Sequence, residues 1–149
     1  MPRFIVDEHA AKLARWLRLI GYDTLYVNPI GDADLAGLAR RDERVVLTRD
    51  TTFARRHGDL RVLRLADDDP FRQLAAVVRA FDLDPKAHCF TRCMLCNAVL
   101  EEIRKEDYRA EIPPEAYERC GRFARCTGCR KLYWDGTHYL RMRERLAQI

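Results

Sequence analysis

The chain has 149 residues, of which 48% are hydrophobic and 34% charged, a composition that excludes extensive disorder and suits one core with a small additional module. No apolar run approaches the ~18 residues needed to cross a bilayer, and the N-terminus carries no leader-like segment, so we expect a cytoplasmic protein without membrane partners. The net charge of +4 arises within residues 86–149, whereas residues 1–85 are balanced. This bias permits a nucleic-acid partner without requiring one.

Short apolar runs alternate with helix-like segments through the first half of the chain. The expected strands are 4–6, 24–27, 45–48 and 61–65. The expected helices are 8–20, 32–41, 51–56 and 70–81. Such alternation favours an α/β fold in which helices flank a parallel sheet. We assign residues 1–85 to this domain and predict that its second strand lies at one edge, followed in space by the first, third and fourth.

Acidic residues follow three of these strands. Asp7 comes directly after the first, Asp50 closes the segment that contains the third, and an acidic run at 67–69 follows the fourth. Parallel strands place their carboxyl ends at one edge of the sheet, so these side chains are expected to converge. Carboxylate oxygens are the ligands that Mg²⁺ and Mn²⁺ prefer, and such an ion can hold a water for attack on a phosphodiester.

Helix capping is the competing explanation for some of these acids, because Asp often precedes the first turn of a helix. It applies to Asp7, Asp32 and Asp69. For Asp7 and Asp50 together we favour the metal role. For Asp34 and Asp68 the sequence leaves the choice open, since each has an acidic neighbour that could substitute.

All six cysteines lie between Cys89 and Cys129. Two Cys-x-x-Cys pairs predict a tetrahedral zinc site with the ligands Cys93, Cys96, Cys126 and Cys129. A closed site of this kind is structural, and it suits a C-terminal domain (86–149) that has too little core to fold alone and ends in a basic helix. Cys89 and Cys120 are left over. Burial is the simplest account of them, while a disulfide between them or an exchange with a ligand stays open.

Three basic residues recur at three-residue intervals on the first expected helix: Lys12, Arg15 and Arg18. They predict a basic stripe, which either faces solvent or contacts phosphates. The chain contains no glycine-rich nucleotide loop and no serine, so neither a nucleotide cofactor nor a serine nucleophile is supported.

Several motifs together resemble those of one family. They are Asp7-Glu8, Lys-Leu-Ala-Arg-Trp-Leu-Arg at 12–18, Gly-Tyr-Asp at 21–23, Leu-Thr-Arg-Asp at 47–50, Arg92-Cys93 with Cys96-Asn97, and Tyr-Trp-Asp-Gly-Thr-His at 133–138. The chain resembles the Mut-seven C-terminal RNase domain family throughout, whose members join a PIN-like fold to a zinc ribbon. The Leu-Thr-x-Asp segment is shared more widely with PIN nucleases, where its aspartate is a metal ligand.

The resemblance implies a ribonuclease that depends on Mg²⁺ or Mn²⁺. By position, the catalytic acids would be Asp7, Asp34, Asp50 and Asp68, with Asp7 and Asp50 as metal ligands. Asp32 versus Asp34, and the choice within 67–69, stay open. RNA would contact Lys12, Arg15, Arg18, Arg130, Lys131 and Trp134. The alternative is a catalytically silent adaptor that binds RNA or the ribosome. The RNA, a protein regulator and the oligomeric state are left open.

Overall fold

The computed structural model describes residues 1–149 and contains two sheets. The N-terminal sheet is parallel, with the strands β1 (Phe4–Val6), β2 (Thr24–Tyr26), β3 (Val45–Thr48) and β4 (Val62–Arg64). Its order is β2-β1-β3-β4, which confirms the predicted order and the α/β fold class. The order reverses between β1 and β3, where Val6 is in register with Leu47. A reversal of this kind leaves a crevice at the carboxyl ends of the two strands, and ligands of open parallel sheets bind in such crevices.

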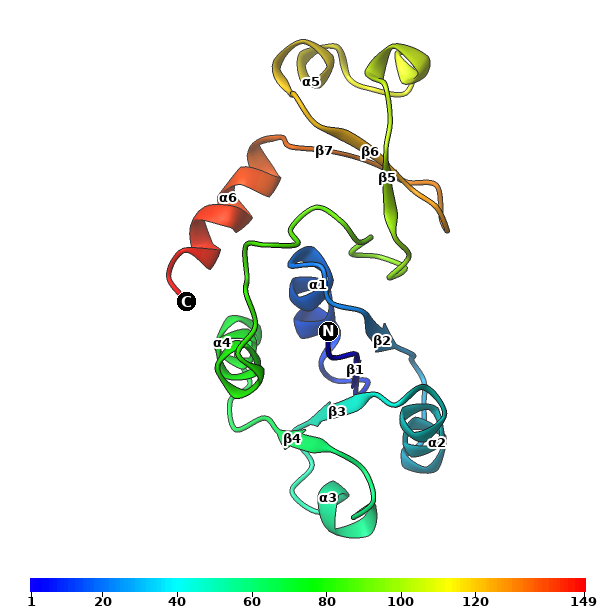
Figure 1. Ribbon diagram of the computed structural model, residues 1–149, viewed down its shortest axis with the longest axis vertical. Helices are drawn as coiled ribbons and strands as arrows, with labels where there is room; N and C mark the ends of the chain where they lie inside the picture. Colours follow the sequence, from blue (N-terminus) through cyan, green and yellow to red (C-terminus); the bar gives the residue numbers. More distant parts are fainter.

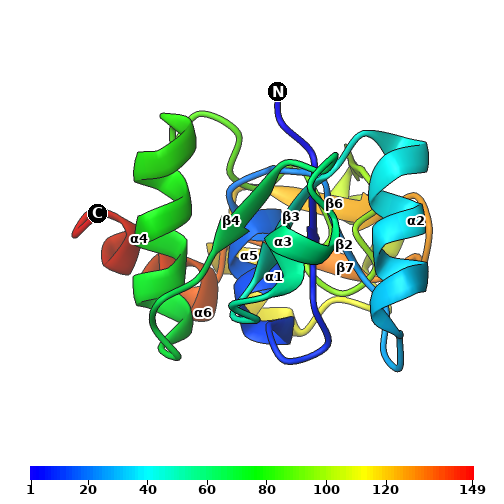
Figure 2. The ribbon, with the colours of Figure 1, turned by 90° about the horizontal axis from the view of Figure 1, so that it is seen from below.

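Helices cover both faces of the N-terminal sheet (Figures 1 and 2). Phe4, Val6 and Leu47 belong to one apolar cluster with α1 (Ala11–Leu19) and α4 (Pro70–Phe81). Ile5 and Val46 point to the opposite face, where they pack with α2 (Asp32–Asp42) and α3 (Phe53–Arg56). Alternate residues of a strand face opposite sides, and burial on both sides explains why these strands are apolar throughout.

Local hydrogen bonds explain where two helices begin. The carboxylate of Asp69 accepts the N–H groups of Phe71 and Arg72 and thereby caps α4, as predicted. The first helix was predicted from residue 8 but starts at Ala11. Asp7 accepts the N–H of His9, and this turn holds the chain out of the helix before α1 begins.

The C-terminal sheet is antiparallel and has the order β5-β6-β7. Its strands are β5 (Leu100–Glu102), β6 (Phe123–Cys126) and β7 (Leu132–Trp134), and the connection from β5 to β6 carries the 3-10 turn η1 (Lys105–Tyr108) and α5 (Pro114–Arg119). The last helix, α6 (Thr137–Leu146), returns from this sheet and ends beside α4 (Figure 1). Tyr139 and Leu146 of α6 join the same apolar cluster as Phe4, so one core crosses the boundary that the sequence placed after residue 85.

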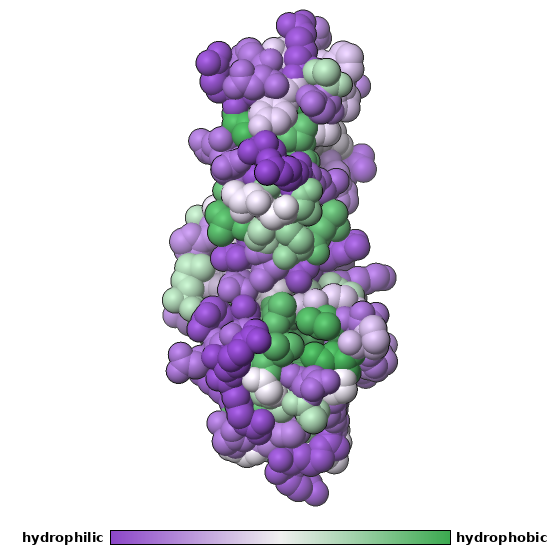
Figure 3. Space-filling model, turned by 90° about the vertical axis from the view of Figure 1, so that its right-hand side faces the viewer, coloured by the Kyte–Doolittle hydropathy of each residue, from purple (hydrophilic) through white to green (hydrophobic).

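None of the helices has the length and the apolar character that crossing a membrane would require. On the face shown in Figure 3, hydrophilic residues predominate and hydrophobic residues gather in separate patches over the two halves of the molecule.

Candidate functional site

Asp7 and Asp50 lie at the carboxyl ends of the neighbouring strands β1 and β3. The hydroxyl of Thr48, the last residue of β3, donates a hydrogen bond of 2.7 Å to Asp7 Oδ2. The same hydroxyl oxygen accepts the backbone N–H of Asp50 at 3.1 Å. One buried side chain therefore ties both acidic positions to the crevice between β1 and β3.

Thr52 and Arg56 surround the carboxylate of Asp50. Its Oδ1 accepts the backbone N–H of Thr52 at 2.8 Å and the Thr52 hydroxyl at 2.9 Å. Its Oδ2 accepts a guanidinium N–H of Arg56 at 2.8 Å. These hydrogen bonds, chiefly those from Thr52, lower the pKa of Asp50, so the side chain is a carboxylate at neutral pH. The same Arg56 nitrogen also donates to Asp32, which draws the start of α2 toward Asp50.

Helix geometry separates Asp32 from Asp34. The residues of α2 that are buried against the sheet are Leu35, Ala36 and Ala39. Successive helical residues turn by ~100°, so Asp32 lies on this inner side and Asp34 lies roughly 200° around the helix from Asp32. Asp32 and Asp34 are both exposed to solvent, so their direction around the helix and not their burial separates them. The structure thus brings Asp32 toward Asp50 and leaves the expected catalytic residue Asp34 apart from it.

The acidic run after β4 divides into different local roles. Asp69 caps α4. Asp67 accepts the N–H of Asp69 at 2.8 Å and an N–H of Arg72 at 3.4 Å, and the backbone hydrogen bond is the main cause of its lowered pKa. Asp68 is exposed and takes part in neither arrangement. Of the three, Asp68 keeps the carboxylate least committed to local structure.

The oxygens at this edge of the sheet fit a hard cation. Both oxygens of Asp7 and Oδ2 of Asp50 accept one hydrogen bond each, so each keeps a lone pair for another partner. No three acidic side chains bring one oxygen each within 4.8 Å of one another. A divalent ion at this edge would therefore have to be held partly through water, as Mg²⁺ usually is. Arg56 pairs with Asp32 and Asp50 and so already supplies one positive charge at this edge.

The four cysteines of the Cys-x-x-Cys pairs form a second, separate cluster. Their sulfur atoms all lie within 4.8 Å of one another. The Sγ atoms of Cys93 and Cys129 are 3.7 Å apart, and those of Cys96 and Cys126 are 3.3 Å apart. Zn–S bonds of ~2.3 Å in a tetrahedron place the sulfurs ~3.8 Å from one another. The arrangement therefore fits one zinc ion with no position left for water.

The backbone around each cysteine pair supports thiolates. The residue after each pair, Asn97 or Arg130, has a left-handed conformation with φ of 74° or 66°. Backbone N–H groups within the second pair also point at a sulfur: those of Gly128 and Cys129 donate to Cys126 Sγ at 3.3 and 3.4 Å. Gly128 is required here, because a Cβ added at this position would lie only 2.9 Å from the Cβ of Ala98. We refer to residues 93–97 and 126–130 as the first and second knuckles.

Titration of the cluster reflects these surroundings. The N–H of Ala98 lowers the pKa of the Cys96 thiol to about 6, whereas burial raises the pKa of Cys126 to about 11. The hydroxyl of Tyr133 lies 2.9 Å from Cys93 Sγ, and burial together with this contact raises the pKa of Tyr133. Tyr133 thus stays protonated, and its hydroxyl covers the cluster at a distance from which it would donate to a thiolate at Cys93.

The first knuckle is docked onto the N-terminal sheet by Arg18. The guanidinium of Arg18 donates to the carbonyl of Thr24 at 2.9 Å and to the carbonyls of Met94 and Leu95 at 3.1 Å each. Only 5% of Arg18 is exposed, so it does not continue the expected basic stripe. A three-residue step falls short of a full helical turn, and after two steps Arg18 has rotated roughly 120° from Lys12. Phosphate binding by Arg18 does not fit this burial.

Asn97 makes a second connection that sequence reasoning missed. Its side-chain oxygen accepts the N–H of Thr24 at 3.0 Å, and its amide nitrogen donates to Asp23 at 2.7 Å. Arg44 donates to the same carboxylate at 2.7 Å. Asp23 and Asn97 both lie in the motifs that carried the family resemblance. That coincidence was the available signal for their role, although their contact spans 74 positions of the sequence.

The other basic positions are exposed. Lys12 and Arg15 on α1 line a groove together with α6, whereas Lys131 and Trp134 line a neighbouring hollow beneath β7. Arg130 is exposed at the end of the second knuckle. The structure therefore places the predicted RNA-contacting residues, apart from Arg18, on surfaces that solvent reaches.

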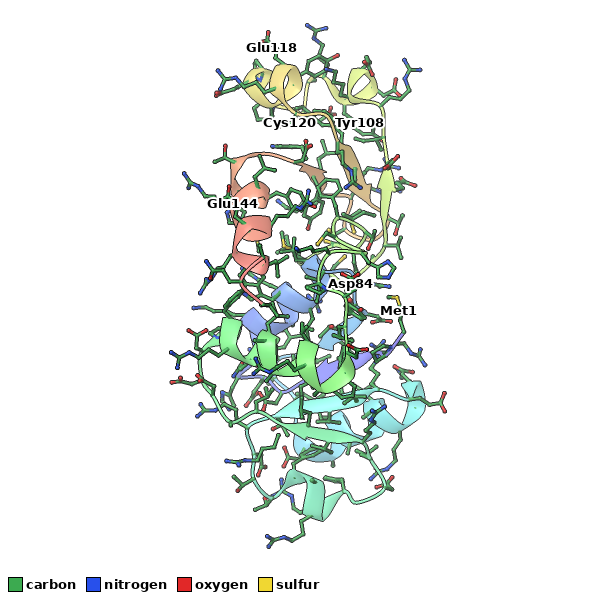
Figure 4. All side chains as sticks on the ribbon, turned by 60° about the vertical axis from the view of Figure 1, so that its left-hand side comes forward. Met1, Asp84, Tyr108, Glu118, Cys120 and Glu144 are labelled. Carbon is green, nitrogen blue, oxygen red and sulfur yellow. The ribbon has the colours of Figure 1, made fainter.

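The two remaining cysteines lie outside the zinc-like cluster and are both free. Cys89 donates to the carbonyl of Pro85 at 3.1 Å, and burial raises its pKa. Cys120 lies beside α5, at the end of the molecule farthest from the N-terminal sheet (Figure 4). Neither replaces a member of the cluster of four.

The fold and these two clusters define an α/β protein with an acidic crevice at a sheet edge and a four-cysteine module. The family model described as Mut7-C RNAse domain matches residues 2–146. Because this match covers nearly the whole chain, the protein belongs to the Mut7-C RNAse domain family. Neither the curated proteins nor the solved structures contained a significant match.

Proposed function

We propose that the protein is a ribonuclease that depends on Mg²⁺ or Mn²⁺ and cuts RNA at the edge of the N-terminal sheet. The metal ligands in this proposal are Asp7 and Asp50, and Asp32 replaces Asp34 as the third acid. Asp68 completes the acidic edge, which we define as Asp7, Asp32, Asp50 and Asp68. The observation that carries the proposal is the Thr48 hydroxyl, which joins Asp7 to Asp50 at the crevice between β1 and β3.

The residues of the acidic edge have distinct parts in this chemistry. A divalent cation held by Asp7 and Asp50 would supply an activated water and would neutralise charge on the phosphate. Asp50 remains ionised because Thr52 lowers its pKa, so it acts as a ligand and not as a proton donor. Thr48 fixes the orientation of the Asp7 carboxylate. Arg56 balances the charge of Asp32 and Asp50 when the edge is empty of other cations.

We also propose that the four cysteines hold a structural zinc ion and that residues 86–149 form a zinc-ribbon domain that assists RNA binding. The sulfur separations and the N–H groups aimed at Cys126 support zinc. Lys12 and Arg15 would contact phosphates from the N-terminal domain (1–85). Arg130, Lys131 and Trp134 would contribute from the ribbon, with Trp134 available to stack on a base.

Cleavage of a labelled single-stranded RNA tests this proposal. The protein is used with its zinc content measured, in buffer depleted of other metals, and Mn²⁺ or Mg²⁺ is then added. We expect cleavage only after addition, and a loss of at least about 100-fold in Asp50→Asn, because a charge that stabilises the transition state is removed. The pair Asp32→Asn and Asp34→Asn distinguishes the two candidates for the third acid. An Asp50→Asn protein that cuts RNA at the wild-type rate would refute the assignment.

A catalytically silent RNA-binding adaptor is the second candidate. It is favoured by the pairing of Arg56 with both Asp32 and Asp50, since a permanent internal cation would leave no role for a metal. This candidate predicts that RNA is bound but stays intact with either added metal. Removing the competing cation with Arg56→Ala would then also fail to produce cleavage.

A further inference from the structure

A groove of about 630 Å³ lies between α1, the start of α4, the first knuckle and α6. Four cationic side chains from two helices line it: Lys12, Arg15, Arg141 and Arg145. None of the four forms a salt bridge, so their charge is not cancelled by the protein. The one acid in the lining, Asp69, already accepts two N–H groups of α4. The groove thus presents unbalanced positive charge, which suits a phosphate chain.

The floor of the groove is apolar. Trp16 and Phe71 meet edge to face with their ring centres 5.4 Å apart, and the guanidinium of Arg145 lies 4.4 Å from the centre of the Phe71 ring. The first knuckle adds Met94 and Leu95, and 53% of Leu95 is exposed. A cationic rim over an apolar floor matches a single strand, whose bases are available for stacking. The base faces of a duplex are stacked inside the helix and cannot contact this apolar floor.

The groove extends in both directions along the molecule. Met94 and His138 also line the hollow of about 250 Å³ beneath β7, where Lys131 and Trp134 lie. At the other end, Lys12 and Asp69 belong to the starts of α1 and α4. Both helices begin at the carboxyl edge of the sheet. α1 follows β1 and Asp7, and α4 follows β4 and the acidic run at 67–69. A strand in the groove would therefore run from the acidic edge toward β7.

From this geometry we propose that the groove binds single-stranded RNA, with phosphates against Lys12, Arg15 and Arg141 and with bases over the knuckle and toward the β7 hollow. The inference deepens the proposed function and rests on it for the choice of RNA as ligand. It assigns the first knuckle a direct role in the binding surface, because two of the floor residues lie between Cys93 and Cys96.

Equilibrium binding without Mg²⁺ or Mn²⁺ tests the groove separately from catalysis. The zinc-loaded full-length protein is titrated into a fluorescent single-stranded RNA at several salt concentrations. In Arg15→Ala and Arg141→Ala, the slope of log affinity against log salt should fall by ~0.7 per lost phosphate contact. Arg143→Ala is the matched control, because Arg143 lies on the same helix as Arg141 but lines a different hollow beside Cys89. Its slope should equal that of the wild type.

A second pair of variants tests the apolar floor. Leu95→Ala should weaken single-strand binding several-fold while leaving the salt slope unchanged, because it removes an apolar contact to a base and no charge. Val99→Ala is the control, since Val99 is also 53% exposed but does not line the groove. A duplex RNA and polyglutamate serve as competitors. At equal total charge, we expect that neither the duplex nor polyglutamate displaces the labelled single strand from the protein. The single strand should displace either of them.

The results separate this inference from the proposed function. Equal losses in Arg141→Ala and Arg143→Ala, or displacement of the RNA by polyglutamate at equal charge, would overturn the groove as a specific site. If Arg15→Ala, Arg141→Ala and Leu95→Ala bind RNA like the wild type while Mn²⁺ still supports cleavage, the groove inference fails and the ribonuclease stands. If binding depends on the groove but no metal supports cleavage, the groove stands and the ribonuclease fails.

Discussion

Thr48 shows how one hydroxyl organises the candidate site. It donates to Asp7 Oδ2 and accepts the N–H of Asp50 while being only 2% exposed. In Thr48→Val the shape is kept but both partners lose a part-buried hydrogen bond, which water can partly replace, so we expect a loss of about 1 kcal/mol in the free energy of unfolding. Cleavage should fall by at least about tenfold because Asp7 is no longer oriented. Urea unfolding and kcat/KM measure the two effects.

Thr48→Ser is the control for that substitution, because serine keeps the hydroxyl. It should retain most of the cleavage activity. Wild-type kcat/KM in Thr48→Val would show that the hydroxyl does not position the acids.

Substitution of Arg18 tests whether this buried residue, which was predicted to bind RNA, instead stabilises the contact between the first knuckle and the N-terminal sheet. In Arg18→Met the carbonyls of Thr24, Met94 and Leu95 lose their charged donor. We expect the free energy of unfolding to fall by about 3 kcal/mol, because polar groups at a packed interface lose their partners. The salt slope of RNA binding should stay at the wild-type value. A lower slope with unchanged stability would instead return Arg18 to the phosphate-binding surface.

At the residue scale, the sequence predicted where residues lie on the strands and helices better than which groups their side chains contact. Asp7 and Asp50 could be found because a carboxylate at the end of a parallel strand has only one edge to occupy. Our proposal of Asp32 in place of Asp34 depends on the rotation of α2 and the contact of Arg56 with Asp32, neither of which the sequence shows. Arg18 could not be placed from a three-residue spacing, since its acceptors lie up to 77 positions away in the chain.

The connection between Asp23 and the first knuckle makes the docking of the two sheets depend on pH. Burial alone would raise the pKa of Asp23, but hydrogen bonds from Arg44 and Asn97 outweigh it and lower the pKa. A carboxylate with a lowered folded-state pKa stabilises the fold above the unfolded value of about 4, and this contribution is lost as the pH falls through the folded pKa. Asp23→Asn should therefore be less stable than the wild type at neutral pH.

Urea unfolding of both proteins across the pH range measures that difference. It should begin to shrink below about pH 4 and should be lost once the pH is below the lowered folded-state pKa, where the wild-type carboxyl is neutral as well. A stability difference that does not change with pH would show that the charge of Asp23 is not what holds Asn97.

The cysteine cluster predicts one zinc ion per chain. We expect Cys96→Ser to lose zinc and, with it, hydrogen-exchange protection in β5, β6 and β7, because binding a structural metal is coupled to folding of the site. Cys120→Ser should keep one equivalent of zinc, since Cys120 lies outside the cluster. Elemental analysis and hydrogen exchange report the two properties. Full zinc content in Cys96→Ser would contradict the four-cysteine assignment.

At the element scale, the strands and helices of the N-terminal half were predictable, whereas β5, β6, β7 and the segment between β5 and β6 were not. β3 was predicted with its observed bounds, and α4 was predicted because an aspartate followed by proline marks its start. The segment between β5 and β6 has no hydrophobic periodicity, so η1 and α5 were missed. The two knuckles were predictable because ligand spacing fixes their chemistry without reference to the rest of the chain.

At the scale of the whole molecule, docking of the two sheets creates a surface that neither half has alone. α6 returns from the C-terminal sheet to pack beside α4, and Arg145 reaches the ring of Phe71. The sequence showed that the excess positive charge lies in residues 86–149, but the groove depends on how that charge meets Lys12 and Arg15. Such placement follows from a shared core and could not be read from local patterns. The likeness to PIN nucleases stays a prediction.

The most direct test of the account is a Mn²⁺ titration followed by the electron paramagnetic resonance signal of the free ion. We expect that the zinc-loaded wild-type protein binds Mn²⁺, that Asp7→Asn and Asp50→Asn lose most of this binding, and that Asp34→Asn retains it. Wild-type Mn²⁺ binding by the Asp7→Asn, Asp50→Asn double variant would contradict the claim that these two carboxylates hold a divalent ion together.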